Sequence, residues 1–380
     1  MIYETSKQLL INYHVFWLTT INTKISSLKM DRHPVSIDDN KYEEFNIEIL
    51  GKDTNFTNRN LIHSTLGVLK YVLKLFRKLE IMSKYDYILL NSIPYIGVNF
   101  LTYALKRRQI KVVVIFHEAW YNYPSGFFGT LTRKMIRRAI RSIVKDVDGI
   151  ISVSSPTTQS LIDNYKVPAE KIVTVPLATV APHAQITALL SKKRDITMCF
   201  IGRLSSIKHV EDFVLAFNFI SNVDKSVNAF VIGEGPKKEY LIKIAKKSEN
   251  QDRIKFTGYL NEDEKNEIVS RSILFVMPSE REGFSIATLE AMYYGAIPVV
   301  ALPNQKELFG MGEFIKNGEN SLTFSVGDVK DLVTKITTLI RNVDLQQRLR
   351  INAMKTSRQY SWDKSGEKLR DSLNKFFNLN

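Results

Sequence analysis

The chain has 380 residues, of which 44% are hydrophobic and 24% are charged, a composition typical of globular proteins and a length sufficient for two domains. It contains no uncharged apolar run of about 18 residues and no secretory signal pattern, so we expect a cytoplasmic protein without a membrane-spanning helix. The single cysteine, Cys199, excludes an internal disulfide and a cysteine zinc site, and its apolar neighbours predict a buried thiol.

The net charge of +14 is larger in the first half of the chain, where residues 1–190 hold 24 Lys and Arg against 15 Asp and Glu, a balance of +9. Such an excess indicates an anionic partner, which is a phosphate-bearing ligand, a nucleic acid or a lipid surface. Composition alone leaves these alternatives open.

The first residues follow a helical pattern through Leu9 and Leu10, and Val15, Phe16 and Trp17 follow as a strand. An open α/β domain normally begins with a strand and a turn. We therefore expect the first strand and the Gly-rich turn of this domain to be missing, either because the strand has been lost or because the gene was assigned a late start.

From residue 85 onwards, short β-branched runs alternate with amphipathic stretches, which predicts parallel sheets covered by helices. The runs lie at residues 85–92, 111–118, 149–155, 171–177, 196–202, 229–235, 253–259, 272–279 and 296–302. A polar, Ala-rich segment at 181–195 interrupts them, so we expect an N-terminal domain at 1–185 and a C-terminal domain at 186–362. Residues 363–380 are expected to form a helix that crosses back to the first domain.

The segment 131–145, "LTRKMIRRAIRSIVK", is a basic amphipathic helix, with Met135 on the apolar side and six basic residues together on one face. These are Arg133, Lys134, Arg137, Arg138, Arg141 and Lys145. The face is either an ordinary solvated surface or one that attracts anionic lipid headgroups. Nucleic acid is not expected as a partner, because no stacking aromatics accompany the charges. The nearby pair Asp146 and Asp148 spells a D-x-D metal motif, but Asp148 directly precedes a strand, so we expect no metal there.

Two turns after predicted strands carry the candidate ligand-binding residues. In "CFIGRLSSIKHV", Arg203 and Lys208 lie before a helix that begins near Val210, where their charges suit a diphosphate. In "SEREGFSIATLEAMYYGAIPVVA", the turn holds Glu282 and the following helix holds Glu290. The free N–H groups of Gly283, Phe284 and Ser285 at this helix start would face an anion.

The two glutamates are eight residues apart, which places their backbones about 12 Å apart in a helix. The carboxyl groups of a retaining glycosidase are only about 5–5.5 Å apart. Two polar contacts to different parts of one elongated ligand therefore fit better than a hydrolytic pair. A third turn, with Gly233 and Gly235, is too weak as a dinucleotide fingerprint, because the third glycine is absent.

The segments "GRLSSIKHVEDFVLAF", "VIGEGP", "IKFTGYL" and "PSEREGFSIATLEAMYYGAIPVVA" together resemble the C-terminal domain of a retaining glycosyltransferase of the GT-B fold, family 4. The resemblance covers residues 195–345 and continues more weakly through "HEAW", "DGIISVSSPTTQSLI" and "VPAEKIVTVPLATV". It implies an α/β protein with two facing Rossmann-like, doubly wound domains and a cleft between them. The family's Pro-Asn-Gly of the interdomain segment is replaced here by Pro176, Leu177 and Ala178.

The resemblance also implies a role for each candidate residue. Glu290 would bind the donor ribose, Glu282 a hydroxyl of the donor sugar, and Arg203 and Lys208 the diphosphate, while His117 would lie near the reacting sugar carbon. The implied catalytic set is His117, Glu282, Arg203 and Lys208. The implied donor-binding set is Gly202, Arg203, Lys208, Gly233, Gly258, Tyr259, Glu282, Gly283, Phe284, Ser285 and Glu290.

These inferences together predict a retaining hexosyltransferase that needs neither a metal nor a cofactor. It would move a sugar from a nucleotide-diphosphate sugar to a glycan or lipid-linked acceptor, in cell-surface polysaccharide or glycolipid biosynthesis, peripherally at the inner face of the cell membrane. The alternative is a degenerate GT-B protein that binds a nucleotide or a partner glycosyltransferase without turnover.

Overall fold

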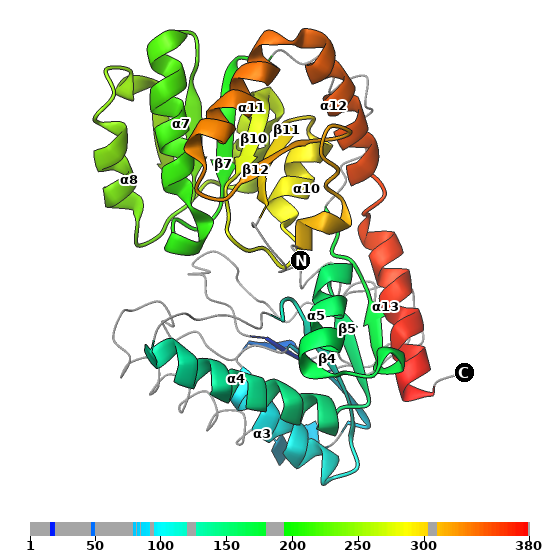
Figure 1. The fold of residues 1–380 in the computed structure, drawn as a ribbon. Coiled ribbons are helices and arrows are strands. Elements are labelled where there is room, and N and C mark those ends of the chain that lie inside the picture. The colour runs from blue at the N-terminus through cyan, green and yellow to red at the C-terminus, as the bar shows by residue number, and fades with distance from the viewer. Residues whose placement is uncertain are drawn as a thin grey trace. The chain divides into compact units, whose positions relative to one another are not determined.

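The structure is a computed structural model that describes residues 16–19, 47–49, 79–80, 82–83, 85–91, 95–119, 127–179, 194–302 and 310–378 (Figure 1). By its internal contacts the chain divides into two compact units. Unit 1 comprises Met1–Val175 and Asp363–Asn380, and unit 2 comprises Pro176–Trp362. The expected helix around Leu9 and Leu10 and most of the 181–195 segment lie outside the described residues.

Unit 1 contains a six-stranded sheet with the order β2-β1-β3-β4-β5-β6, in which all neighbours are parallel. Its strands are β1 (Phe16–Thr19), β2 (Ile47–Ile49), β3 (Tyr87–Asn91), β4 (Lys111–Phe116), β5 (Gly149–Ser152) and β6 (Ile172–Thr174). The four strands predicted in this half from residue 85 onwards are confirmed. The strand expected at Val15–Trp17 forms as β1, and β2 was not predicted.

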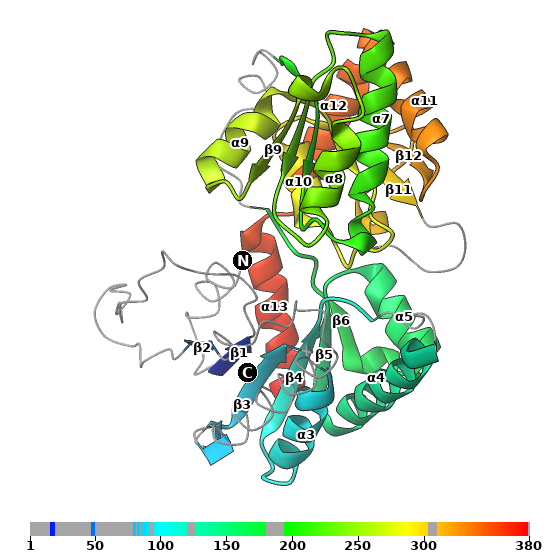
Figure 2. The same cartoon turned by 90° about the vertical axis from the view of Figure 1, so that its left-hand side faces the viewer.

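The helices of unit 1 pack on this sheet through a core of aliphatic side chains. They are α3 (Tyr95–Lys106), α4 (Phe127–Asp146) and α5 (Ser155–Tyr165), and the short helix η1 (Ala169–Lys171) precedes β6. Helices α3 and α4 run side by side in both views (Figures 1 and 2). Leu105 of α3 and Ile140 of α4 are fully buried with Val112 and Val114 of β4, so the apolar stripe of each helix faces the sheet.

The last helix of the chain, α13 (Trp362–Phe377), packs on the sheet of unit 1 although it follows unit 2 in sequence. Its Phe377 carbonyl accepts a 2.8 Å hydrogen bond from Lys111 Nζ, and the Phe377 ring lies 4.6 Å from the Tyr87 ring. A Cβ at Gly149 would lie 2.3 Å from the ring of Phe376. The start of β5 therefore needs glycine for this helix to dock.

Helix α4 differs in part from the sequence expectation. Lys134, Arg138, Arg141 and Lys145 are exposed, whereas Arg133 and Arg137 are half-buried at the flank of the helix and take part in other contacts. Of the six basic residues expected on one face of the helix, these two are therefore only partly exposed. Met135 was expected towards the apolar side, but it is exposed beside Lys134.

The D-x-D pair contributes to the junction of two strands. Asp148 Oδ2 accepts a 2.7 Å hydrogen bond from the Val112 backbone N–H, and Asp148 N donates to the Val112 carbonyl at 2.9 Å. Asp146 lies 3.5 Å from Lys106 Nζ. The role predicted for Asp148, as the residue that starts a strand, is confirmed. Within the described ranges no helix combines the length and apolar character that crossing a bilayer requires.

Unit 2 contains a second six-stranded parallel sheet, with the order β12-β11-β10-β7-β8-β9. Its strands are β7 (Ile196–Ile201), β8 (Ala229–Ile232), β9 (Ile254–Gly258), β10 (Ser272–Met277), β11 (Ile297–Leu302) and β12 (Leu322–Ser325). Its longer helices are α7 (Val210–Val223), α8 (Lys238–Ala245), α9 (Glu262–Arg271), α10 (Ile286–Tyr293), α11 (Val329–Arg341) and α12 (Val343–Ser357). Its short helices are η2 (Ser206–Lys208), η3 (Gln251–Arg253) and η4 (Gly310–Glu313).

The five strands predicted in this half are confirmed, and β12 was not predicted. Cys199 is fully buried in β7, where burial raises the pKa of its thiol to about 12, so the predicted buried thiol is confirmed. From β7 the chain builds outwards through β8 and β9, then returns to the other side of β7 to form β10, β11 and β12. The strand order therefore reverses between β7 and β10, and open α/β sheets bind ligands at the carboxyl ends of the strands at such a point.

Candidate functional site

The loops that leave β7, β8, β9 and β10 form one connected rim at the carboxyl edge of the unit 2 sheet. Backbone hydrogen bonds of 2.9–3.0 Å join them in sequence from one strand end to the next. These bonds are Gly233 N to Gly258 O, Leu204 N to Glu234 O, Lys237 N to Leu204 O, and Glu280 N to Ile207 O. The rim is therefore set by main-chain contacts, which hold its side chains in place.

Two glycines allow the β7 and β8 loops to meet. Gly233 has a φ of +134°, and a Cβ there would lie 2.0 Å from the Gly202 carbonyl oxygen. A Cβ at Gly235 would lie 2.3 Å from the Leu204 carbonyl oxygen. Both positions require glycine for close backbone approach, which is a structural reason for the "GEG" sequence.

The structure brings Lys208 and Glu282 together where the strand order reverses. Lys208 ends η2 after β7, Glu282 follows β10, and Lys208 Nζ donates a hydrogen bond to Glu282 Oε1. The side chains are 21% and 10% exposed, so the ion pair is largely withdrawn from solvent but still reachable. Arg203, on the same loop as Lys208, is exposed. The loops that border the point where the strand order reverses thus carry two anionic side chains, Glu280 and Glu282, and three cationic ones, Arg203, Lys208 and Arg281.

Glu290 is held by a different lysine, which the sequence motifs did not reveal. Lys265 of α9 donates to Glu290 Oε2 at 3.0 Å and to Glu262 Oε2 at 2.7 Å. Burial alone would lower the pKa of Lys265, but the carboxylates of Glu290 and Glu262 outweigh burial and raise it. Lys265 is therefore positively charged, and each of the two candidate glutamates has its own cationic partner.

The turn before α10 is strained and tightly supported. Ser285 adopts a left-handed conformation with a φ of 69°, which is uncommon for a non-glycine residue, and its Oγ lies 2.8 Å from Thr288 Oγ1. Gly310 N donates to the Glu282 carbonyl at 2.9 Å, and a Cβ at Gly310 would lie 1.8 Å from the Gly283 carbonyl oxygen. This support fixes the first N–H groups of α10 at the carboxyl edge of the sheet.

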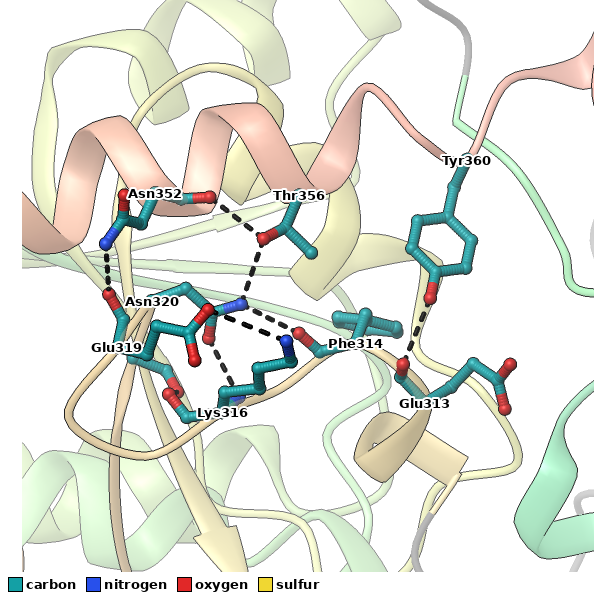
Figure 3. Close-up of polar contacts among 9 residues, drawn as sticks. Glu313, Phe314, Lys316, Glu319, Asn320, Asn352, Thr356 and Tyr360 are labelled. Atoms are coloured by element: carbon teal, nitrogen blue, oxygen red, sulfur yellow. Dashed lines mark hydrogen bonds and ion pairs between the residues drawn. The ribbon is translucent and has the colours of Figure 1, made fainter.

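Phe284 anchors the turn before α10 to the core of unit 2. Its ring is buried against Phe314, with centroids 5.2 Å apart, and against Tyr360 at 5.9 Å. In this position the side chain of Phe284 belongs to the core, so only its backbone can meet a ligand. The Tyr360 hydroxyl donates to the Glu313 carbonyl at 3.0 Å (Figure 3).

Buried Asn320 holds the segment behind this aromatic cluster. Its side chain accepts from Lys316 N at 2.8 Å and donates to the Phe314 carbonyl at 2.8 Å and to Thr356 Oγ1 of α12 at 3.1 Å (Figure 3). The segment that carries Phe314 is thereby tied to α12, and Phe314 in turn supports Phe284.

The remaining candidate residues lie on other elements. Gly258 ends β9 with a φ of +73°, and a Cβ there would approach Glu234 Oε1 to 2.7 Å, while Tyr259 is exposed beside it. His117 follows β4 in unit 1, where burial lowers its pKa to about 4. Its imidazole is therefore neutral at pH 7, with one nitrogen that donates and one that accepts.

Two family models match consecutive parts of the chain. The model described as glycosyl transferases group 1 matches residues 184–356, and the model described as glycosyltransferase family 4 matches residues 35–179. The chain belongs to glycosyltransferase family 4. The resemblance found in the sequence motifs is confirmed.

Curated relatives of the chain include enzymes named for different products. Glycogen synthase of Mycobacterium tuberculosis is 23% identical over 65% of the chain and 57% of its own length. Alpha-monoglucosyldiacylglycerol synthase of Streptococcus pneumoniae is 25% identical over 75% of the chain and 67% of its own length. The chain thus spans about two thirds or less of each of these relatives.

Solved structures share the fold of the chain. The complex of Anabaena HepE with UDP-glucose has a TM-score of 0.64 at 18% identity, covering 87% of this chain and 86% of that one. Sucrose-phosphate synthase from Thermosynechococcus elongatus has a TM-score of 0.75 at 14% identity, covering 100% and 93%. The predicted GT-B fold of two Rossmann-like, doubly wound domains is confirmed.

Proposed function

We propose that the protein is a retaining hexosyltransferase that takes a sugar from a nucleotide-diphosphate sugar. The observation that carries this proposal is the Lys208–Glu282 ion pair at the reversal point of the unit 2 sheet, beside the supported start of α10. A structural neighbour, Anabaena HepE, has been solved in complex with UDP-glucose, which supports a donor of this class.

The charges at the rim suit departure of a nucleoside diphosphate. When the bond between sugar and phosphate breaks, negative charge develops on the phosphate oxygen. Lys208, Arg203 and the N–H groups of residues 283–285 supply positive potential, held in place before the reaction. With these groups the proposed mechanism needs neither a metal nor a cofactor. We propose that neutral His117 forms a hydrogen bond with the donor sugar.

The rim suggests separate roles for the two glutamates, with Glu282 on the sugar and Glu290 on the ribose. Lys208 is bonded to Glu282, so removing this carboxylate frees the lysine for phosphate. We expect Glu282→Ala to leave the binding of free nucleoside diphosphate unchanged or tighter and to abolish sugar transfer. Glu290→Ala should lower the affinity for free nucleoside diphosphate by about tenfold or more, because hydrogen bonds to a charged group are lost.

Calorimetric titration of UDP, GDP and ADP into both variants, with transfer rates measured in parallel, tests this division. An equal loss of diphosphate affinity in the two variants would contradict it.

We propose a glycan or lipid-linked acceptor in polysaccharide or glycolipid biosynthesis, reached at the inner face of the cell membrane. The exposed basic stripe on α4, defined as Lys134, Arg138, Arg141 and Lys145, supports a surface contact with anionic lipid. Such contacts contribute about 1 kcal/mol per basic residue near the cytoplasmic leaflet and act within a Debye length of about 10 Å at 0.1 M salt.

Reversing Lys134, Arg138 and Arg141 to glutamate should weaken vesicle binding by at least about a hundredfold, from the loss of about 1 kcal/mol per residue. Co-sedimentation with anionic and neutral vesicles, at low and high salt, measures this. The wild type should pellet only with anionic vesicles at low salt. The matched control is reversal of Lys243, Lys246 and Lys247, which are exposed on and just after α8 in unit 2 and should leave binding intact. Equal binding by the α4 variant and the wild type would favour a soluble acceptor.

A further inference from the structure

Lys265 connects the helix after β9 to the helix that carries Glu290. It lies in the first half of α9, whose start is fixed by a capping box in which Asn261 Oδ1 accepts from Glu264 N at 2.9 Å. From this fixed position its Nζ reaches Glu290 Oε2 on α10 at 3.0 Å. The contact therefore joins α9 to α10, the helices that precede and follow β10 in the sequence.

The two partners of Lys265 differ in exposure. Glu262 is 78% exposed, so its ion pair with Lys265 is a surface pair of small energetic value. The side chain of Glu290 is 20% exposed and that of Lys265 is 12% exposed, so this ion pair is largely shielded from solvent. Shielded charges interact more strongly and are less screened by salt. Of its two carboxylates, Lys265 is therefore held mainly by Glu290.

The lysine contact leaves acceptor capacity on Glu290. A carboxylate offers about four lone-pair sites on two oxygens, and Lys265 uses a site on Oε2. Among the described residues no other group bonds to the remaining sites, which suit neighbouring hydroxyl groups, and the ion pair restricts rotation of the carboxylate. An oriented carboxylate with free acceptor sites suits a pair of adjacent hydroxyls.

We propose that Lys265 is a positioning residue for ribose recognition, which orients Glu290 to accept both hydroxyls of the nucleoside ribose. This inference rests on the proposed function. The lysine also offsets the negative charge of Glu290, which would otherwise repel the diphosphate of the same ligand. Loss of the lysine should therefore weaken nucleotide binding and reduce the preference for ribose over deoxyribose.

The test uses calorimetric titration of three probe pairs, UDP and dUDP, GDP and dGDP, and ADP and dADP, into the full chain. The wild type should bind one ribonucleotide about tenfold or more tightly than its 2′-deoxy counterpart, because a hydroxyl bonded to a charged acceptor is lost. Lys265→Met should reduce this ratio to within about threefold, the scale of a weak neutral contact. Lys265→Arg should keep most of the ratio, since a cation remains at the same place.

Glu262→Gln is the matched control, since it removes the exposed partner of Lys265 and leaves the Glu290 contact in place; its ratio should equal that of the wild type. If Lys265→Met fails to fold by circular dichroism, Lys265→Gln takes its place. A wild-type ratio retained in the folded Met or Gln variant would overturn the inference. Binding of none of the six probes by the wild type would instead count against the proposed function itself.

Discussion

Lys208→Ala should reduce donor affinity and the rate of sugar transfer by about 30-fold to several thousand-fold. Removing one partner of a desolvated charge pair typically costs about 2–5 kcal/mol, and each 1.4 kcal/mol is a factor of ten. Here the change removes the cation proposed to meet the diphosphate and leaves Glu282, 10% exposed, as an unpaired anion beside it. Both consequences oppose binding of an anionic donor.

Calorimetry with the nucleoside diphosphate and initial rates with the nucleotide sugar measure the effect. The matched control is Lys335→Ala, which breaks an ion pair with Asp331 on the surface of α11 and should change neither quantity. Arg203→Ala should act in the same direction with a smaller effect, because Arg203 is exposed. Donor kinetics unchanged in both the Lys208 and the Arg203 variant would remove these residues from the site.

Gly233→Ala should lower donor affinity by at least tenfold and reduce the melting temperature by several degrees. The added Cβ would lie 2.0 Å from the Gly202 carbonyl oxygen, so the β7 and β8 loops would have to separate and the loop bearing Lys208 would shift. Overpacking typically costs about 1–3 kcal/mol, and a side chain at an unfavourable backbone conformation adds a cost of similar size.

Gly318→Ala is the control for backbone strain alone. Gly318 has a φ of +75°, but a Cβ there would have no neighbour within 4 Å. Thermal melts and diphosphate titrations of the two variants separate the two effects. If Gly233→Ala resembled Gly318→Ala in both measurements, close loop packing would not be what shapes the rim.

Most of the strands are readable from the sequence, because β-branched runs such as "KVVVIF" and "AIPVVA" are bounded by polar or turn residues. The two missed strands are β2 and β12, which contain 3 and 4 residues and form sheet edges. Such short runs carry little periodic signal. Their pairing depends on neighbours that are distant in sequence.

Site residues could be predicted from the sequence where a single turn carries them. Contacts between residues of distant elements could not. Lys208 and Glu282 were each located from a local turn, yet their mutual ion pair depends on the order of β7 and β10. Lys265 was missed because it lies in a charged helix that resembles any solvated surface. The turn at Phe284 was predicted, but only packing against Phe314 and Tyr360 shows that its ring points into the core.

Turnover of nucleotide sugars by the wild-type protein is the most direct test of the proposed transferase activity. Release of the nucleoside diphosphate from UDP-, GDP- and ADP-sugars would be followed with and without candidate acceptors, with Lys208→Ala as the impaired control. We expect release from at least one donor by the wild type and a loss of about 30-fold or more in the variant. Tight diphosphate binding without release from any donor would contradict this activity and would favour a binding protein that lacks turnover.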